Sequence, residues 1–179
     1  FKAHPANKRN EFTTWKQPEP PKAIPVSYLP SSLLATDTHR DRNNLFRFMS
    51  KEFGDVEANR VFDLYHVGTS RHWRNSDGLS TTFPQINEKG KLCQLKVMAY
   101  NPNTGKRMKK QDRAEMWSDK AQKYIPDTRP MDKIWFAGKT LLKNYEANLQ
   151  QTFFGCHLIK ASYRIGSVES EKSALICSI

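Results

Sequence analysis

The stretch that decides the fold is YRIGSVESEKSALI, at residues 163–176. Its first half is rich in aromatic and β-branched residues and predicts a short buried strand that ends near Val168. Ser170 can cap a helix that opens with Glu171, whose charge is favourable at the positive end of the helix dipole. Glu169 would then lie at the junction of strand and helix, the edge at which open α/β sheets bind ligands. A carboxylate there is suited to holding a divalent metal.

The segment VESEKSA at residues 168–174 resembles the first motif of the Toprim domain, the metal-binding catalytic fold of bacterial-type primases and topoisomerases. The family pattern is Glu-Gly-x-x-Asp, and this chain has Ser170 in place of the glycine and Ser173 in place of the aspartate. This version is similar to the Toprim-containing, primase-like proteins of Bacteroidetes mobile elements. The similarity covers most residues from about Ile24 onward, in segments that resemble the domain preceding Toprim in those proteins: 24–30, 43–45, 68–73, 100–107 and 153–159.

The resemblance implies that Glu169 is the catalytic, metal-binding glutamate and that Lys172 can meet a phosphate. The implied metal is Mg²⁺, but Toprim chemistry also needs a later Asp-x-Asp, which the 179 residues do not contain. We therefore expect a fragment that binds nucleic acid without catalysis, with Mg²⁺-dependent primase-like nucleotidyl transfer in a longer parent chain. A Toprim-type nuclease, a degenerate non-catalytic Toprim protein, and an ordinary surface carboxylate at Glu169 are the alternatives.

The composition is strongly basic, with 29 Lys and Arg against 18 Asp and Glu and a net charge of +11. This excess favours a polyanionic partner, most commonly nucleic acid. The three cysteines form no Cys-x-x-Cys, so neither a zinc site nor a disulfide framework is expected. The sequence contains no secretory segment and no run of eighteen apolar residues, so we expect a cytoplasmic protein without a membrane span.

We expect three regions: an extended basic arm or linker over 1–23, an α+β domain over 24–160, and the start of a truncated Toprim domain over 161–179. The predicted fold class is α+β, with mixed helices and an antiparallel β-hairpin sheet, followed by the first strand and helix of an α/β Toprim unit. The expected helices are one over 43–53 that Asn43 caps, one that Asp55 caps, and one over 139–151. We also expect a strand over 64–67, a hairpin of 79–87 with 91–100, and a mostly irregular segment over 111–133.

Four consecutive residues, Arg71, His72, Trp73 and Arg74, combine two guanidinium groups with an imidazole and an indole. This combination suits phosphate contact and base stacking. The alternative is that Trp73 packs under the sheet while the arginines stay in solvent.

The densest basic cluster lies at residues 106–113, which hold five basic residues and one acid. Lysine and arginine at a hairpin end can contact phosphates without reading the base sequence, whereas the alternatives are a solvated loop or a surface for an acidic protein. The expected partner is single-stranded DNA or another nucleic acid, with a replicative helicase or other replication protein as a further partner. The candidate phosphate-binding residues of this hairpin are Lys96, Lys106, Arg107, Lys109 and Lys110.

Overall fold

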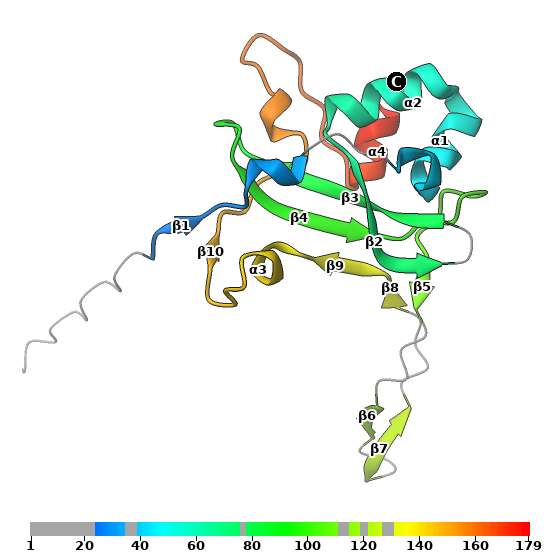
Figure 1. The fold of residues 1–179 in the computed structure, drawn as a ribbon, viewed down its shortest axis with the longest axis vertical. Coiled ribbons are helices and arrows are strands. Elements are labelled where there is room, and N and C mark those ends of the chain that lie inside the picture. The colour runs from blue at the N-terminus through cyan, green and yellow to red at the C-terminus, as the bar shows by residue number, and fades with distance from the viewer. Residues whose placement is uncertain (1–23, 35–38, 76–77, 111–114, 119–121, 127–130) are drawn as a thin grey trace, which may run out of the picture.

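A four-stranded antiparallel sheet organises the computed structural model, which describes residues 24–34, 39–75, 78–110, 115–118, 122–126 and 131–179 (Figure 1). The strand order is β2-β3-β4-β9, and the expected arm over 1–23 lies outside the described residues. The four strands are β2 (Gly68–Asn75), β3 (Gly78–Ile86), β4 (Leu92–Met98) and β9 (Ile134–Phe136).

The hairpin predicted from the sequence is confirmed as β3 and β4, with Thr81 opposite Met98. Its turn is held by Asn87, whose Oδ1 accepts the N–H groups of Lys89 at 3.0 Å and Lys91 at 2.9 Å. Gly90 has a φ of +71°, a conformation that glycine adopts without steric cost.

Helices α1 (Asn44–Phe53), α2 (Asp55–Leu64) and α4 (Glu171–Ile176) pack on one face of the sheet. The predicted α1 is confirmed, since Asn43 Oδ1 accepts the first free N–H groups of the helix, and Gly54 ends it with a φ of +85°. Gly54, and not Asp55 as expected, is also the N-cap of α2. The first apolar core lies beneath these helices and comprises Leu45, Met49, Ala58, Val61, Phe62, Val67, Phe83, Met98, Tyr100 and Leu175.

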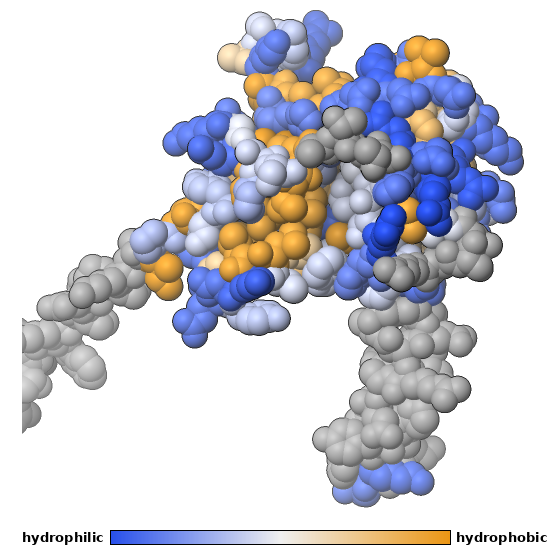
Figure 2. Space-filling model, viewed as in Figure 1, coloured by the Kyte–Doolittle hydropathy of each residue, from blue (hydrophilic) through white to orange (hydrophobic). Residues whose placement is uncertain are grey.

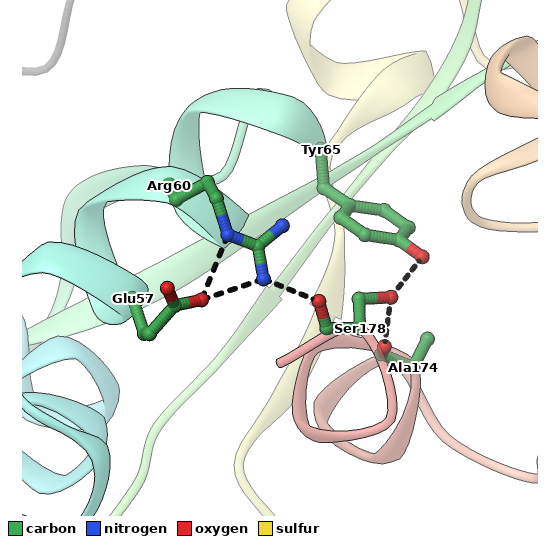
Figure 3. Close-up of polar contacts among 5 residues, drawn as sticks. All are labelled: Glu57, Arg60, Tyr65, Ala174 and Ser178. Carbon is green, nitrogen blue, oxygen red and sulfur yellow. Dashed lines mark hydrogen bonds and ion pairs between the residues drawn. The ribbon is translucent and has the colours of Figure 1, made fainter.

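The last helix is tied directly to α2, as Figure 3 shows. Arg60 donates to the carbonyl of Ser178 and is paired with Glu57, one turn away on α2. Ser178 Oγ donates to the Ala174 carbonyl at 2.8 Å, so Tyr65 must donate its hydroxyl proton to Ser178 Oγ across a second 2.8 Å contact. Helix α4 is therefore an integral part of the core around α2.

The opposite face of the sheet carries a second apolar cluster, built from Leu29, Ile86, Leu92, Leu95, Val97 and Ala137. It is covered by the 3₁₀ helix η1 (Ser31–Leu34) and by the residues that follow α3 (Gly138–Leu141). The covering side chains Leu34 and Leu142 stay half-buried. Figure 2 shows a strip of apolar side chains over the middle of the sheet beside η1.

Short strand pairs surround this body. β1 (Val26–Ser27) runs parallel to β10 (Asn148–Leu149), and β5 (Lys109–Lys110) pairs with β8 (Met131–Asp132). The hairpin of β6 (Glu115–Ser118) and β7 (Lys123–Pro126) extends away from the sheet in Figure 1, within a segment that the sequence predicted to be mostly irregular. The remaining elements are the 3₁₀ helices η2 (Arg40–Arg42) and η3 (Cys156–Leu158).

Three predicted elements do not form. Residues 163–168 are an exposed segment without strand structure, because no neighbouring strand in the described ranges offers them backbone hydrogen bonds. The predicted helix over 139–151 is reduced to α3, and Lys143 takes a φ of +52° just beyond it. The predicted strand over 64–67 is the end of α2 and a turn in which His66 has a φ of +53°. No helix in the described residues is long and apolar enough to cross a membrane.

Candidate nucleic-acid interface

The middle of strand β2 is not paired with its partner strand, β3. Its pairing with β3 is interrupted between Ser70 and Asn75, so the segment that carries Arg71 to Arg74 bulges out of the ladder. The His72 ring stacks on the Trp135 ring of β9, with the centroids 3.9 Å apart and the planes at 11°. β2 and β9 are the two edges of the sheet, so the bulged segment must cross the face of β3 and β4, as the course of β2 in Figure 1 shows.

The rings at this crossing differ in exposure. His72 is exposed, whereas Trp73 is half-buried against the second apolar cluster and meets the edge of His72 at 4.5 Å. Trp73 therefore packs against the sheet, as the alternative interpretation predicted, and so does the half-buried Trp135. His72 is the accessible ring of the stack. Partial desolvation of the His72 ring lowers its pKa below the ordinary value of 6.5, which favours the neutral ring.

Two guanidinium groups accompany this stack in the sequence. Arg71 is exposed and its Nη2 lies 3.1 Å from Nε2 of His39. Arg74 belongs to β2, but its side chain lies outside the described residues. The exposed guanidinium of Arg71, the residue before His72, can contact a phosphate of a strand whose base lies on the His72 ring.

Part of the basic cluster lies on strands that lead to the same stack. The N–H of Lys133 donates to the Met108 carbonyl at 2.9 Å, and Lys133 precedes Trp135 by two residues. Lys109 follows Met108 and is exposed, whereas the side chain of Lys110 lies outside the described residues. With about 3.3 Å per residue and about 4.8 Å between strands, roughly 10 Å separates the backbone of Lys109 from that of Trp135. Sequence patterns do not predict this pairing, because β5 and β8 are far apart in the chain.

Lys96 and Lys172 lie on the other face, at the helices. Lys96 Nζ is 2.7 Å from Glu171 Oε1, and only 16% and 10% of the two side chains are exposed. Lys96 therefore neutralises the charge of Glu171 in α4. The expectation that Lys96 adds its charge to the basic hairpin does not hold. Lys172 Nζ donates to the Gly105 carbonyl at 2.9 Å, and its pKa is lowered by burial and by the nearby charge of Arg107.

The predicted residues thus form two separate groups. His72 and Trp135 form the aromatic stack, Arg71 precedes His72 in β2, and Lys109 lies on β5, whose partner strand β8 precedes Trp135 in the chain. Lys106 and Arg107 lie in the segment that meets α1 and α4, where Gly105 is in contact with Phe48. Figure 2 shows many hydrophilic side chains on the side of the molecule that carries α1.

Glu169 is an exposed residue in the segment before α4. Across the described ranges, no group of three or more His, Cys, Asp or Glu side chains is close enough to hold a metal ion. One carboxylate does not make a Mg²⁺ site, so the residues present do not fit this metal by themselves. Ser170 does cap α4 as predicted, since its Oγ accepts the N–H of Ser173 at 3.2 Å.

Comparison with known proteins gives one match. Residues 43–179 match the model of a family described as a domain of unknown function, DUF6371. No curated protein and no solved structure matches the chain.

Proposed function

The chain belongs to the DUF6371 family, and from its geometry we propose that this domain binds single-stranded nucleic acid. The observation that carries the proposal is the stack of the exposed His72 ring on the half-buried Trp135 ring, with an exposed arginine, Arg71, directly before His72 in the chain. The partner is DNA, in the cytoplasmic replication or mobilisation of a mobile element by a primase-like protein, with a replicative helicase or other replication protein as a further partner.

Base stacking and positive charge supply the affinity for a single strand. Every base has a π face, so an exposed ring binds single strands without sequence preference, and each stacked base contributes about 1–3 kcal/mol. The net charge of +11 adds an attraction for phosphates that salt weakens. Trp135 is anchored in the second apolar cluster, so the stack is held in place before a base arrives.

The Toprim resemblance adds a catalytic role to the proposal. Glu169 would serve as a catalytic, metal-binding residue only when carboxylates from outside these 179 residues join it, and Mg²⁺ would be held only then. We derive no catalytic step from Glu169 alone, because a single carboxylate does not build the site.

The stack is tested by removing both rings together. The double variant His72→Ala, Trp135→Leu keeps an aliphatic side chain in the second cluster, and it should bind a fluorescent single-stranded oligonucleotide about 5-fold to 100-fold more weakly. Fluorescence anisotropy measures the affinity, and thermal unfolding verifies that the variant is folded. Tyr145→Ala, which removes an exposed aromatic ring outside the stack, should change the affinity less than 2-fold, roughly the effect of a surface substitution.

Equal affinities of the folded double variant and the wild type would remove the stack from the interface. If the wild type binds neither DNA nor RNA, the proposal is wrong, and binding of an acidic protein would explain the charge instead.

A further inference from the structure

A cleft of about 550 Å³ lies at the end of the sheet that is formed by the start of β4 and the end of β9. Gln85 and Gln94 are directly opposite each other in the hairpin, and both line it. Phe136 and the segment 147–152 complete the walls, and Lys139 is the one charged residue among the described residues that line the cleft.

The cleft lies on the face opposite to the aromatic stack. Successive side chains of a strand point to opposite faces, so Phe136 faces away from Trp135, its neighbour in β9. Phe136 is opposite Lys96 in the register, and Lys96 reaches α4. A ligand in the cleft therefore does not occupy the His72–Trp135 stack.

Two amides of the cleft have their oxygens already occupied. Gln94 Oε1 accepts the N–H groups of Gly138 at 2.7 Å and Leu95 at 2.9 Å. Gln150 Oε1 accepts from Asn87 Nδ2 at 2.9 Å and from the Tyr28 hydroxyl at 3.2 Å. Each oxygen fixes its side chain, so each amide is left with its NH₂ group as the end available to a ligand.

The remaining groups of the cleft are also available. Among the described residues, the side-chain amide of Gln85 has no hydrogen-bond partner, so it can both donate and accept. The Phe136 side chain is exposed, with 55% of the residue accessible, and its ring centre lies 5.8 Å from Lys96 Nζ. Lys139 is exposed and carries a positive charge.

These groups are complementary to a nucleotide. Fixed NH₂ donors need acceptors, which the ring nitrogens and carbonyl groups of bases supply, and glutamine amides pair with base edges. An exposed phenyl ring offers a stacking surface, and lysine attracts a phosphate. No acidic side chain is among the described residues of the lining, which disfavours a cationic ligand.

We propose that this cleft binds a nucleobase through Gln85, Gln94 and Gln150, with Phe136 as the stacking surface and Lys139 at the phosphate. The choice of ligand rests on the proposed function. The nucleobase belongs either to a free nucleotide or to the bound strand.

The probes are the four deoxynucleoside 5′-monophosphates, with deoxyribose 5-phosphate as the base-free control, measured by isothermal titration calorimetry on the full chain. At least one nucleotide should bind about tenfold or more tightly than the base-free control. Gln94→Glu is the sharpest variant, because its carboxylate still accepts from Gly138 and Leu95 while the NH₂ donor is lost. We expect roughly tenfold to hundredfold weaker nucleotide binding for this variant.

The matched control is Gln122→Glu, which makes the same change of charge at an exposed residue outside the cleft and should change the affinity less than 2-fold. Gln85→Met, which removes a polar group without adding charge, should also weaken nucleotide binding. Competition then distinguishes the two sources of the base. If the cleft binds a base of the strand, the mononucleotide should displace the oligonucleotide. If the cleft binds a free nucleotide, both ligands should bind at the same time.

Three outcomes would overturn the inference: no nucleotide binding up to millimolar concentration, equal binding of deoxyribose 5-phosphate, or an unchanged affinity in both cleft variants. A tripeptide amide that binds as tightly as the best nucleotide would also overturn it. Strand binding that depends on the aromatic stack without nucleotide binding would defeat this inference alone. Nucleotide binding that depends on Gln94, without strand binding, would defeat the proposed function alone.

Discussion

Lys96 and Glu171 are 2.7 Å apart and largely buried between β4 and the first turn of α4. Removing one charge of a buried pair leaves the other without compensation, which typically costs about 3–5 kcal/mol. Glu171→Gln should therefore lower the free energy of unfolding by about 3 kcal/mol, measured by urea denaturation. Glu169→Gln makes the same change at an exposed carboxylate two residues earlier and should alter stability by less than about 0.5 kcal/mol. If both variants lose the same stability, the ion pair does not hold α4 on the sheet.

Single residues could be predicted from the sequence where their partners are local. The caps Asn43 and Ser170 were predicted correctly, because a cap depends on residues two or three positions away. The other contacts of Asn43 could not be predicted, since it donates to the Gly68 carbonyl and accepts from Thr81 Oγ1 across the fold. The Trp135 ring was missed as a site residue for the same reason.

At the scale of elements, the predicted hairpin and helix α1 formed because their apolar spacing and their turn or cap agree. Residues 163–168 have strand-like composition, but a strand also requires a neighbour, and none pairs with them. The apolar spacing over 139–151 indicated a helix, whereas Leu149 belongs instead to β10, which pairs with β1. In both segments the structure depends on pairing with a distant strand, and the local sequence pattern carries no information on that pairing.

The contact between the end of α2 and η3 should make folding depend on pH. Burial lowers the pKa of His157 below 6.5, and the nearby His66 lowers it further. The unfolded chain takes up a proton near pH 6.5 and the folded chain resists it, so this stability is present above pH 6.5 and is lost as the pH falls below that value. The free energy of unfolding should therefore decrease from pH 7 to pH 5.

Chemical denaturation at a series of pH values measures this slope. His157→Asn should reduce the slope. Part of the pH slope should remain in every variant that retains His72, because the pKa of His72 is also lowered. An identical slope in the wild type and in His157→Asn would show that the contact between α2 and η3 does not sense pH.

At the scale of the whole molecule, composition predicted a basic α+β chain but not the distribution of its charge. The expected hairpin charge is divided by the fold, since Lys96 is neutralised by Glu171 and Lys172 donates to the Gly105 carbonyl. Lys109 lies instead on β5, which pairs with β8, the strand that precedes Trp135 in the chain. A net charge of +11 therefore does not act as one surface, and the two basic groups can be tested separately.

The salt dependence of strand binding locates the path of the nucleic acid. Each phosphate contact to a single strand contributes about 0.7 to the slope of log K against log salt concentration. Lys109→Ala with Lys110→Ala should flatten the slope by about 1.4, twice that contribution, because β5 leads to the aromatic stack. Lys106→Ala with Arg107→Ala removes the same charge beside α4 and should change the slope by less than half as much. The opposite ranking would place the strand over α1 and α4, and the His72–Trp135 stack would then serve only to hold β2 across the sheet.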